Sequence, residues 1–539
     1  ATRVDASQLI EKGRENVLLQ SNQFDTTWVN YQSAETGGQP DKDGGSTAWK
    51  LTRTTTGSSV LYQLGLSFSL ATFSLYAKAA EDNWILIEGV SSSGIPIQYF
   101  DLQNGVKGTS GGVGFVDSSI TSVGGGWYRI SITMSVSGGN RISILNASAD
   151  NTASGSIGDG VYIMNAQLEQ GLVSTSVIET GATSAQAGIL ENTPRLDYSG
   201  GASCPSLLLE PSRTNSTDFS EYFNASYWTK SEATIVNNVT ISPEGVQNAS
   251  KIVESSSTSS HRIYEGTAGS SSIFSFYAKA AERTWVSVLS NSGGFSYFDI
   301  GNGVLGTIQS SSVGTIESAG SGWYRCTLYN GHGTYGNYIG LASANNTSSY
   351  AGDGTSGAYI YGAQLESNAS YPTSYIPTYG VSQTRALDIC NSSENSVLFN
   401  KTEGVLFLES SALAEGDDKR ISLSDGTMSN YVSIGYSRFS GNIVAEMVSG
   451  GVSQQPNWGA TGVTQTDNNK FALSWGSGTM KFYVNGVQTL TESVTSPVGL
   501  DILRFSAGDS SLRFNGETKQ VIVFPTALTD SECIALTTI

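Results

Sequence analysis

The sequence predicts an all-β protein made of tandem antiparallel β-sandwiches. Charged residues are only 14% of the 539 residues and 62 residues are glycine, which suits many short strands joined by tight turns. Many short segments alternate apolar and polar residues with a period of two, the pattern of a strand with one buried face. A long internal repeat indicates that the chain contains two domains of the same fold.

The repeat consists of four landmarks that return in the same order with nearly unchanged spacing. The two copies therefore differ only by small changes in their loops. The pairs are SLYAKAAEDNW at 74–84 with SFYAKAAERTW at 275–285, YFDLQNGV at 99–106 with YFDIGNGV at 297–304, GWYR at 126–129 with GWYR at 322–325, and AQLE at 166–169 with AQLE at 363–366.

Three junctions divide the chain, at 2–5, 194–197 and 384–388. Each holds an arginine followed two or three residues later by an aspartate, and each precedes a new apolar segment. They place domain edges near residues 17, 190 and 390, and a chain of this length has room for about three or four domains. We expect four parts: an N-terminal arm at 1–16, a first repeat at 17–190, a second repeat at 191–390 and a third sandwich at 391–539.

The arm is too short to fold alone, so it is expected to dock onto a partner. Asp5 or Ser7 is placed to cap a brief helix over residues 8–11.

Pleating decides which side chains of the repeats face the core. Phe73, Leu75 and Ala77 alternate with Tyr76 and Lys78, so the first three are expected inside and the other two outside. The same rule puts Phe100, Leu102, Tyr128 and Ile130 inside. Trp84 and Trp285, which open the next apolar segments, are expected in the core. The predicted outward set is Tyr76, Lys78, Tyr99, Asp101, Trp127 and Arg129 in the first copy and Tyr277, Lys279, Tyr297, Asp299, Trp323 and Arg325 in the second.

Turns and the third sandwich follow from local patterns. Asn-Gly pairs at 104–105, 302–303 and 485–486 indicate hairpins, because both central residues of a type I′ turn need positive φ. Strands are expected at 405–408, 431–434, 471–475 and 480–487, and a short capped helix at 531–536.

These strings carry a family resemblance. The repeats resemble the jelly-roll carbohydrate-binding modules of bacteriophage tail and fibre proteins through YAKA, GWYR, GDG and AQLE, and through PRLDYSGGASCPSLLLEPSRTN at 194–215. The last region resembles the concanavalin-like or laminin-G-like lectin sandwich through WGSGTMKFYVNGV at 475–487 and VIVFPTALTDSECIALTT at 521–538. The first junction departs from the pattern, because a helix-like stretch replaces the Gly-rich Cys-Pro turn.

The resemblance implies a virion structural protein, a fibre or receptor-binding component that is assembled in the host cytoplasm and contacts cell-surface or environmental glycans outside. It further implies a homo-oligomer, most often a trimer, and an arm suited to attachment to other virion proteins. Two other hypotheses stay open: a capsid or tail decoration protein with purely structural sandwiches, and a polysaccharide depolymerase or an accessory module of a secreted carbohydrate-active enzyme.

The outward set suits a sugar ligand. Flat aromatic rings cover the C–H face of a pyranose, while Asp and Arg hydrogen-bond its hydroxyls in a fixed geometry. The same residues also suit structural roles: Trp127 and Trp323 covered by a loop or a neighbouring domain, and Arg129 paired with Glu169. Binding of several weak sites together would add avidity.

Asp159 and Asp353 lie between glycines in Gly-Asp-Gly turns. A carboxylate and neighbouring carbonyls in such a loop suit Ca²⁺, a cation that takes six to eight oxygens. A tight turn without metal explains the same sequence. Structural Ca²⁺ is therefore the one cofactor considered.

Charge and sparse reactive residues exclude several functions. A net charge of −18 without a basic cluster disfavours nucleic acid and anionic membranes, and no apolar run of 18 residues suits membrane insertion. Neither His261 nor His332 lies in a catalytic motif, so a non-enzyme is expected. Cys326 is expected to be a buried small residue, and a bridge between Cys204 and Cys390 is the alternative to free thiols.

Overall fold

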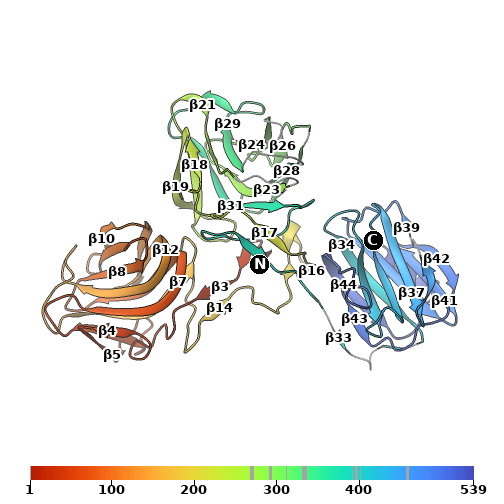
Figure 1. The fold of residues 1–539 in the computed structure, drawn as a ribbon, viewed down its shortest axis with the longest axis horizontal. Coiled ribbons are helices and arrows are strands. Elements are labelled where there is room, and N and C mark those ends of the chain that lie inside the picture. The colour runs from red at the N-terminus through yellow and green to blue at the C-terminus, as the bar shows by residue number, and fades with distance from the viewer. Residues whose placement is uncertain are drawn as a thin grey trace.

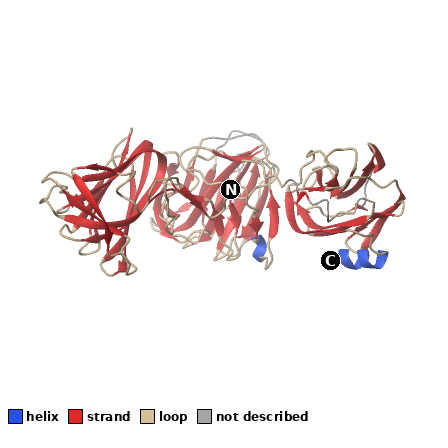
Figure 2. Ribbon diagram, turned by 90° about the horizontal axis from the view of Figure 1, so that it is seen from below, coloured by secondary structure: helices blue, strands red, loops and turns tan. Residues whose placement is uncertain are grey.

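The computed structural model describes residues 2–266, 272–289, 294–310, 312–330, 337–390, 393–394, 399–400, 402–456 and 460–539. Three β-rich lobes follow one another in a row (Figure 2), with repeat 1 in orange, repeat 2 in yellow to green and the third sandwich in blue in Figure 1. Among the described residues, every regular element is a β-strand apart from one α-helix and one 3₁₀ turn, so the all-β prediction is confirmed. Neither of these two helical segments has the length or the apolar character to cross a membrane.

Repeat 1 is one ten-stranded antiparallel sheet folded over itself, in the order β10-β9-β8-β12-β7-β13-β6-β5, with β11 beside β12 and β4 beside β7. The two long strands β7 and β12 run through both layers, and bulges near Gly139 let β12 bend between them. The strands of this sheet are β4 (Val29–Tyr31), β5 (Ser33–Gln39), β6 (Ala48–Arg53), β7 (Val60–Ala79), β8 (Trp84–Ser91), β9 (Ile97–Asp101), β10 (Val106–Gly111), β11 (Phe115–Gly124), β12 (Trp127–Ala147) and β13 (Gly160–Gln170), and β14 (Ala185–Ala187) follows outside it.

The core of repeat 1 confirms the expected inward side. Phe73, Leu75, Ala77 and Ile130 are fully buried together between the layers, and Tyr128 packs against them. Trp84 differs from the prediction: it is half-buried outside this core, as is Trp285 in repeat 2. Each of these indoles follows a turn and begins a strand whose next residue, not the indole itself, points inward.

Repeat 2 has the same arrangement in two separate six-stranded sheets, β18-β22-β29-β24-β25-β26 and β19-β20-β31-β23-β28-β27. Cys326 is fully buried in its core, as expected. The strands are β17 (Arg213–Asn215), β18 (Thr229–Ser231), β19 (Ala233–Thr240), β20 (Ala249–Glu254), β21 (Thr258–Ser260), β22 (Arg262–Tyr264), β23 (Ser272–Ala280), β24 (Trp285–Leu289), β25 (Phe295–Asp299), β26 (Val304–Leu305), β27 (Ser312–Ser318), β28 (Trp323–Asn330), β29 (Tyr338–Ala342), β30 (Ser349–Ala351), β31 (Gly357–Ser367) and β32 (Gln383–Arg385).

The third sandwich packs the sheet β15-β16-β44-β34-β40-β41-β42 on the sheet β33-β43-β35-β36-β37-β38, with β39 beside β37. Its strands are β15 (Leu196–Asp197), β16 (Ser206–Leu209), β33 (Ser393–Glu394), β34 (Gly404–Ala412), β35 (Lys419–Ser424), β36 (Tyr431–Tyr436), β37 (Asn442–Ser449), β38 (Val452–Pro456), β39 (Ala460–Thr461), β40 (Asn469–Gly476), β41 (Thr479–Val484), β42 (Val487–Ser493), β43 (Ile502–Arg504) and β44 (Gly516–Phe524). The 3₁₀ turn η1 (Ser199–Gly201) lies between β15 and β16.

One edge of the third sandwich comes from the second junction. β16 pairs with β44, and Leu209 packs in the core of the third sandwich, although this segment precedes repeat 2 in sequence. These residues fall within the range predicted for the second repeat, yet they complete the sheet of the third.

The turns and the terminal helix test local signals. Asn485 and Gly486 both have positive φ, as a type I′ turn requires, whereas at 104–105 and 302–303 only the glycine does. The type I′ prediction is therefore wrong for those two hairpins. The helix α1 (Asp530–Thr537) confirms the expected helix, and Thr529 forms a capping box with Glu532.

The arm is a β-hairpin, so the predicted helix over residues 8–11 is wrong. β1 (Thr2–Val4) pairs with β2 (Ile10–Lys12), and β3 (Arg14–Asn16) pairs with β14 of repeat 1. Asp5 accepts the N–H groups of Ser7 and Leu9, which closes a turn between β1 and β2 instead of starting a helix.

The three junctions meet at the centre of the molecule, where Figure 1 marks the N-terminus. Val4 donates its N–H to Asp197 at 2.7 Å, and Arg195 donates to the carbonyl of Thr2 at 3.0 Å. Arg195 and Arg385 both lie 2.7 Å from Glu210. The repeated arginine and aspartate therefore bind the junctions to one another.

Candidate functional site

The predicted outward residues lie on two different sheets. Tyr297 and Asp299 belong to β25 in one sheet of repeat 2, whereas Trp323 belongs to β28 in the other. In repeat 1, β9 pairs with β8 and β10, while the Trp127 end of β12 pairs with β7 and β11. Because both layers turn one side to the shared core, their outer sides look away from each other. The prediction of a single face that carries all six residues of each copy is therefore wrong.

Two of the six residues in each copy have structural roles. Asp101 accepts hydrogen bonds from the N–H groups of Gln103 and Asn104 and from the Asn104 amide at 2.7–3.0 Å. Asp299 makes the matching set with Gly301 and Asn302. Tyr99 and Tyr297 are 5% and 4% exposed. The two aspartates close turns, and the two tyrosines are buried on the outer side of their sheets. The prediction that these four side chains are exposed is therefore wrong.

The other residues form the same cluster in each repeat. In repeat 2 we call this cluster the covered face; it consists of Tyr277, Lys279, Trp323, Arg325 and Tyr359. Trp323 is 1% exposed and donates its indole N–H to the carbonyl of Ile241. Ile10 of the arm packs in this cluster. The indole faces away from the main core, as pleating requires, but the prediction that Trp323 is exposed is wrong, because Ile10 of the arm and the backbone at Ile241 lie against it. Lys279, Arg325 and Tyr359 stay partly exposed.

The arm is fixed to repeat 2 by backbone and ionic contacts. The N–H of Ile10 donates to the carbonyl of Pro243 at 2.8 Å. The Lys12 ammonium lies 2.8 Å from Glu221 and 2.6 Å from Glu244, and all three side chains are buried. The covered face is therefore an interface within the chain, and attachment of the arm to other virion proteins stays a prediction.

The pKa directions describe this buried cluster. Burial raises the pKa of Glu221. Burial also opposes ionisation of Glu244, but Lys12 and Arg14 together outweigh it and lower the pKa of Glu244. Burial would lower the pKa of Lys12, yet the two carboxylates raise it above its usual value. Lys12 therefore stays charged and is held by both acids.

In repeat 1 the equivalent cluster is not covered by a hairpin. We call this cluster the open face; it consists of Tyr76, Lys78, Trp127, Arg129 and Tyr162. Trp127 is 2% exposed, beneath its neighbours, so its predicted exposure is also wrong. The other four are partly exposed.

The strand register fixes the layout of the open face. Lys78 lies opposite Trp127 on one side and opposite Tyr162 on the other, and Tyr76 lies opposite Arg129. The Arg129 guanidinium sits 4.7 Å from the centre of the Tyr76 ring and donates to Ser74 at 2.7 Å. Arg129 forms no ion pair with Glu169; that alternative is wrong, because Glu169 binds Thr175.

Sequence reasoning missed two residues here, Tyr162 and Lys42. Tyr162 and Tyr359 occupy the same place in the GDG-to-AQLE segment, so the repeat itself carried the signal. The Lys42 ammonium lies 5.0 Å from the centre of the Tyr76 ring. Lys42 corresponds to Pro243, whose carbonyl binds the arm in repeat 2. The two loops differ in sequence, so the repeat did not reveal this correspondence.

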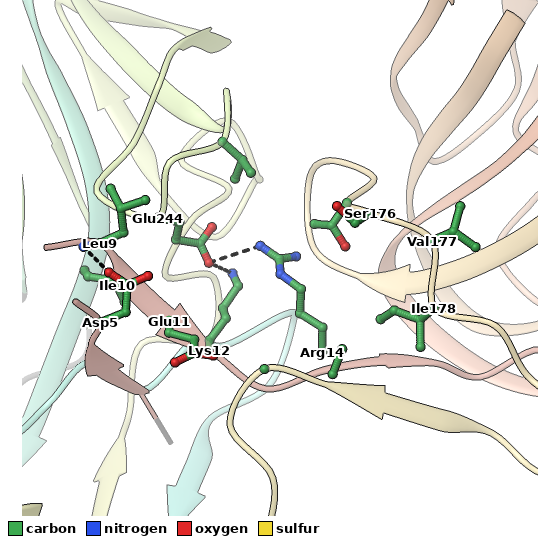
Figure 3. A pocket seen from close by; sticks show the side chains of 14 residues that line it. Asp5, Leu9, Ile10, Glu11, Lys12, Arg14, Ser176, Val177, Ile178 and Glu244 are labelled. Atoms are coloured by element: carbon green, nitrogen blue, oxygen red, sulfur yellow. Dashed lines mark hydrogen bonds and ion pairs between the residues drawn. The ribbon is translucent and has the colours of Figure 1, made fainter. Parts of the chain in front are cut away.

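A separate cavity of about 320 Å³ lies where the arm passes between the repeats. Figure 3 shows Lys12 and Arg14 of the arm pointing toward Glu244, with Ser176 and Val177 of repeat 1 on the far side. Arg14 lies 3.4 Å from Glu244 and 3.9 Å from Glu169. The charged groups of this cavity are directed at one another, which suits a junction between domains.

The two aspartates considered for Ca²⁺ lie in turns. Asp353 accepts the N–H groups of Thr355 and Ser356 and both of their hydroxyls, and the bonds to Ser356 hold its pKa well below the usual value. The carbonyl of Asp159 accepts the N–H of Arg53. Over the described ranges, no group of three or more His, Cys, Asp or Glu side chains is placed to hold a metal.

The remaining reactive side chains have structural surroundings. His261 is fully buried, with its ring nitrogens 2.8 Å from the carbonyl of Glu232 and 3.2 Å from that of Tyr350. His332 lies outside the described residues. All four cysteines are free, so the bridge between Cys204 and Cys390 is not formed.

No protein-family model and no curated protein matches this chain. Solved structures with some likeness include the Ruminococcus gnavus sialidase module CBM40 bound to α2,3-sialyllactose, at 14% identity and a TM-score of 0.22, over 28% of this chain and 95% of that one. The LG1–3 region of the laminin α2 chain has 11% identity and a TM-score of 0.20, over 88% and 96%. The tandem CBM22 domains of Paenibacillus barcinonensis Xyn10C have 11% identity and a TM-score of 0.18, over 69% and 96%. The strand pairing of the chain itself shows its antiparallel β-sandwiches.

Proposed function

We propose that this chain is a non-catalytic glycan-binding structural protein of a bacteriophage particle, a fibre or receptor-binding component that works outside the cell. The observation that carries the proposal is the open face of repeat 1. It places two partly exposed tyrosine rings beside a lysine and an arginine on the sheet, while in repeat 2 Ile10 of the arm packs in the corresponding cluster.

The chemistry of the open face suits a sugar. The ring of Tyr162 offers flat apolar surface to the C–H groups of a pyranose, while the Arg129 guanidinium and the Lys42 ammonium lie over the Tyr76 ring. Lys78 and Arg129 supply hydrogen-bond donors next to those rings. The neighbouring strands hold all four side chains, so little ordering is needed on binding.

The phage setting, the virion partners and a trimeric assembly rest on the resemblance of the repeat and junction strings. A trimer would present three open faces, and weak single sites would then gain avidity. The terminal sandwich is expected to add a further lectin-like surface.

The test is a glycan array with the full chain and a matched pair of variants. Tyr162→Ala removes a ring from the open face, and Tyr359→Ala removes the corresponding ring from the covered face. We expect the first to lose at least tenfold in glycan binding and the second to bind like the unaltered chain. Equal binding by all three proteins would contradict the assignment of the site.

A second candidate is a purely structural decoration protein. The covered face favours it, because there the same aromatic cluster serves as an interface. In that case the open face would be buried against a neighbouring subunit in the assembled particle, and a cryo-EM map of the particle would show it covered.

A further inference from the structure

We propose that the open face binds an acidic sugar, with Lys78 and Arg129 holding its negatively charged group and Lys42 closing one side. This inference rests on the proposed glycan-binding function and specifies the class of ligand.

The first argument is local charge. Four cationic side chains surround the two tyrosine rings of repeat 1, in a chain whose net charge is −18. Lys42 is 2.7 Å from Asp43, and Lys50 is 2.7 Å from Glu81. Among the described residues, Lys78 and Arg129 form no ion pair with a carboxylate. Arg129 stacks on Tyr76 and donates to Ser74, yet no carboxylate of the described chain neutralises it or Lys78, so both charges can attract an anionic ligand.

The second argument is spacing. Lys78 lies opposite Trp127, and Arg129 lies opposite Tyr76, two residues along on the same side of the sheet. Such diagonal neighbours in an antiparallel pair are roughly 7–8 Å apart at their Cα atoms. A carboxylate or sulfate that sits between the two side chains can accept a hydrogen bond from each. The Tyr162 ring then flanks the sugar that carries this group.

The third argument is the difference between the repeats. Lys279 and Arg325 repeat the cation pair, but the Arg325 guanidinium donates to both Ser275 and the carbonyl of Thr373, and Ile10 of the arm packs in the cluster beside them. Pro243 stands where repeat 1 has Lys42. The Glu221 that binds Lys12 in repeat 2 corresponds to Asn22 in repeat 1.

Repeat 1 has therefore lost one of the two acids that hold a basic hairpin and has a third cation instead. The substitutions make this face poorly suited to Lys12 of an arm and well suited to an anion. Charge-assisted hydrogen bonds are about twice as strong as neutral ones, so the acidic group is expected to dominate affinity.

The experiment measures binding of the full chain to acidic oligosaccharides and to their neutral counterparts: uronic-acid oligomers before and after reduction of the carboxyl groups, and sulfated oligomers before and after removal of sulfate. We expect at least one acidic member to bind tenfold or more tightly than its neutral counterpart, and the two series decide between carboxylate and sulfate. Lys78→Gln keeps most of the apolar stem and should remove this preference. Lys279→Gln, its counterpart on the covered face, should leave it unchanged.

The outcomes separate the two proposals. If neutral sugars bind as well as acidic ones and Tyr162→Ala abolishes binding, the acidic-sugar inference fails while glycan binding at the open face stands. If Lys78→Gln and Lys279→Gln change acidic binding equally, the inference also fails. If no acidic or neutral sugar binds, or if Tyr162→Ala has no effect on binding, the proposed function itself fails.

Discussion

Replacing Lys12 tests how firmly the arm joins repeat 2. The Lys12 side chain is 3% exposed and contacts two carboxylates that are 0% and 1% exposed. Lys12→Met keeps a long unbranched side chain but leaves Glu221 and Glu244 without their shared cation. Loss of one partner of a buried ion pair costs about 3–5 kcal/mol, and because Arg14 still contacts Glu244 we expect a loss of about 3 kcal/mol in unfolding free energy. At about 2–4 °C per kcal/mol for a domain of this size, Tm should fall by about 6–12 °C.

The defect should depend on pH in a defined direction. The pKa of Glu244 is lowered in the folded chain, so its contribution is present above its unfolded pKa and is lost as pH falls through the folded pKa. The pKa of Lys12 is raised, so its contribution is complete below its unfolded pKa of about 10.4. The stability difference between the unaltered chain and Lys12→Met should therefore be largest near neutral pH and shrink in acid, where the carboxylates become protonated.

Scanning calorimetry of the full chain at neutral and acidic pH measures this difference. Lys50→Met is the control, because Lys50 pairs with the half-exposed Glu81 and such pairs contribute about 0–1 kcal/mol. Adding Glu221→Gln and Glu244→Gln to Lys12→Met should recover much of the lost stability. A Tm for Lys12→Met no lower than that for Lys50→Met would refute the reasoning.

Three further predictions concern single contacts. Asn16→Ala should destabilise repeat 1 by about 1–3 kcal/mol, because the Asn16 amide hydrogen-bonds two carbonyls and two N–H groups that would stay buried without partners. Asn215 makes the matching four bonds, so Asn215→Ala should destabilise repeat 2 only. Hydrogen exchange resolved by segment would show which repeat opens. Leu209→Asp should accelerate exchange in β44 rather than in repeat 2, and faster exchange confined to repeat 2 would contradict the pairing of β16. Thr529→Ala should lower the stability of the terminal helix by about 1 kcal/mol, seen as faster amide exchange of its first turn, and unchanged exchange would argue against the capping box.

Much of the fold was predictable because pleat periodicity and the internal repeat are local or alignable signals. The inward set around Phe73 and Ile130 is confirmed, and so is the capped terminal helix. The arm was predicted as a helix because Asp5 resembles a cap. The pairing of Thr2 with Lys12 and the bond from Ile10 to Pro243 depend on partners that a local pattern does not reveal.

The candidate site was predictable only in part. Period-two alternation says which side of a strand a residue occupies, and it placed Trp127 and Tyr99 correctly away from the core. It does not say in which layer the strand lies or what covers that layer. Trp127 and Tyr99 consequently fall on opposite outer surfaces, and Trp323 lies under a hairpin from the far end of the sequence. Register and contacts between distant segments decide both points.

The pairing of β16 with β44 has a consequence for how the protein is made. The ribosome releases Ser206–Leu209 before the strands of repeat 2, whereas the matching edge of β44 is synthesised after them. The third sandwich therefore cannot close during translation until repeat 2 and β44 have been produced. Repeat 2 is in effect an insertion whose two ends must be brought together, so a slow or misfolded insertion would leave an unpaired edge on the terminal lobe and expose it to aggregation.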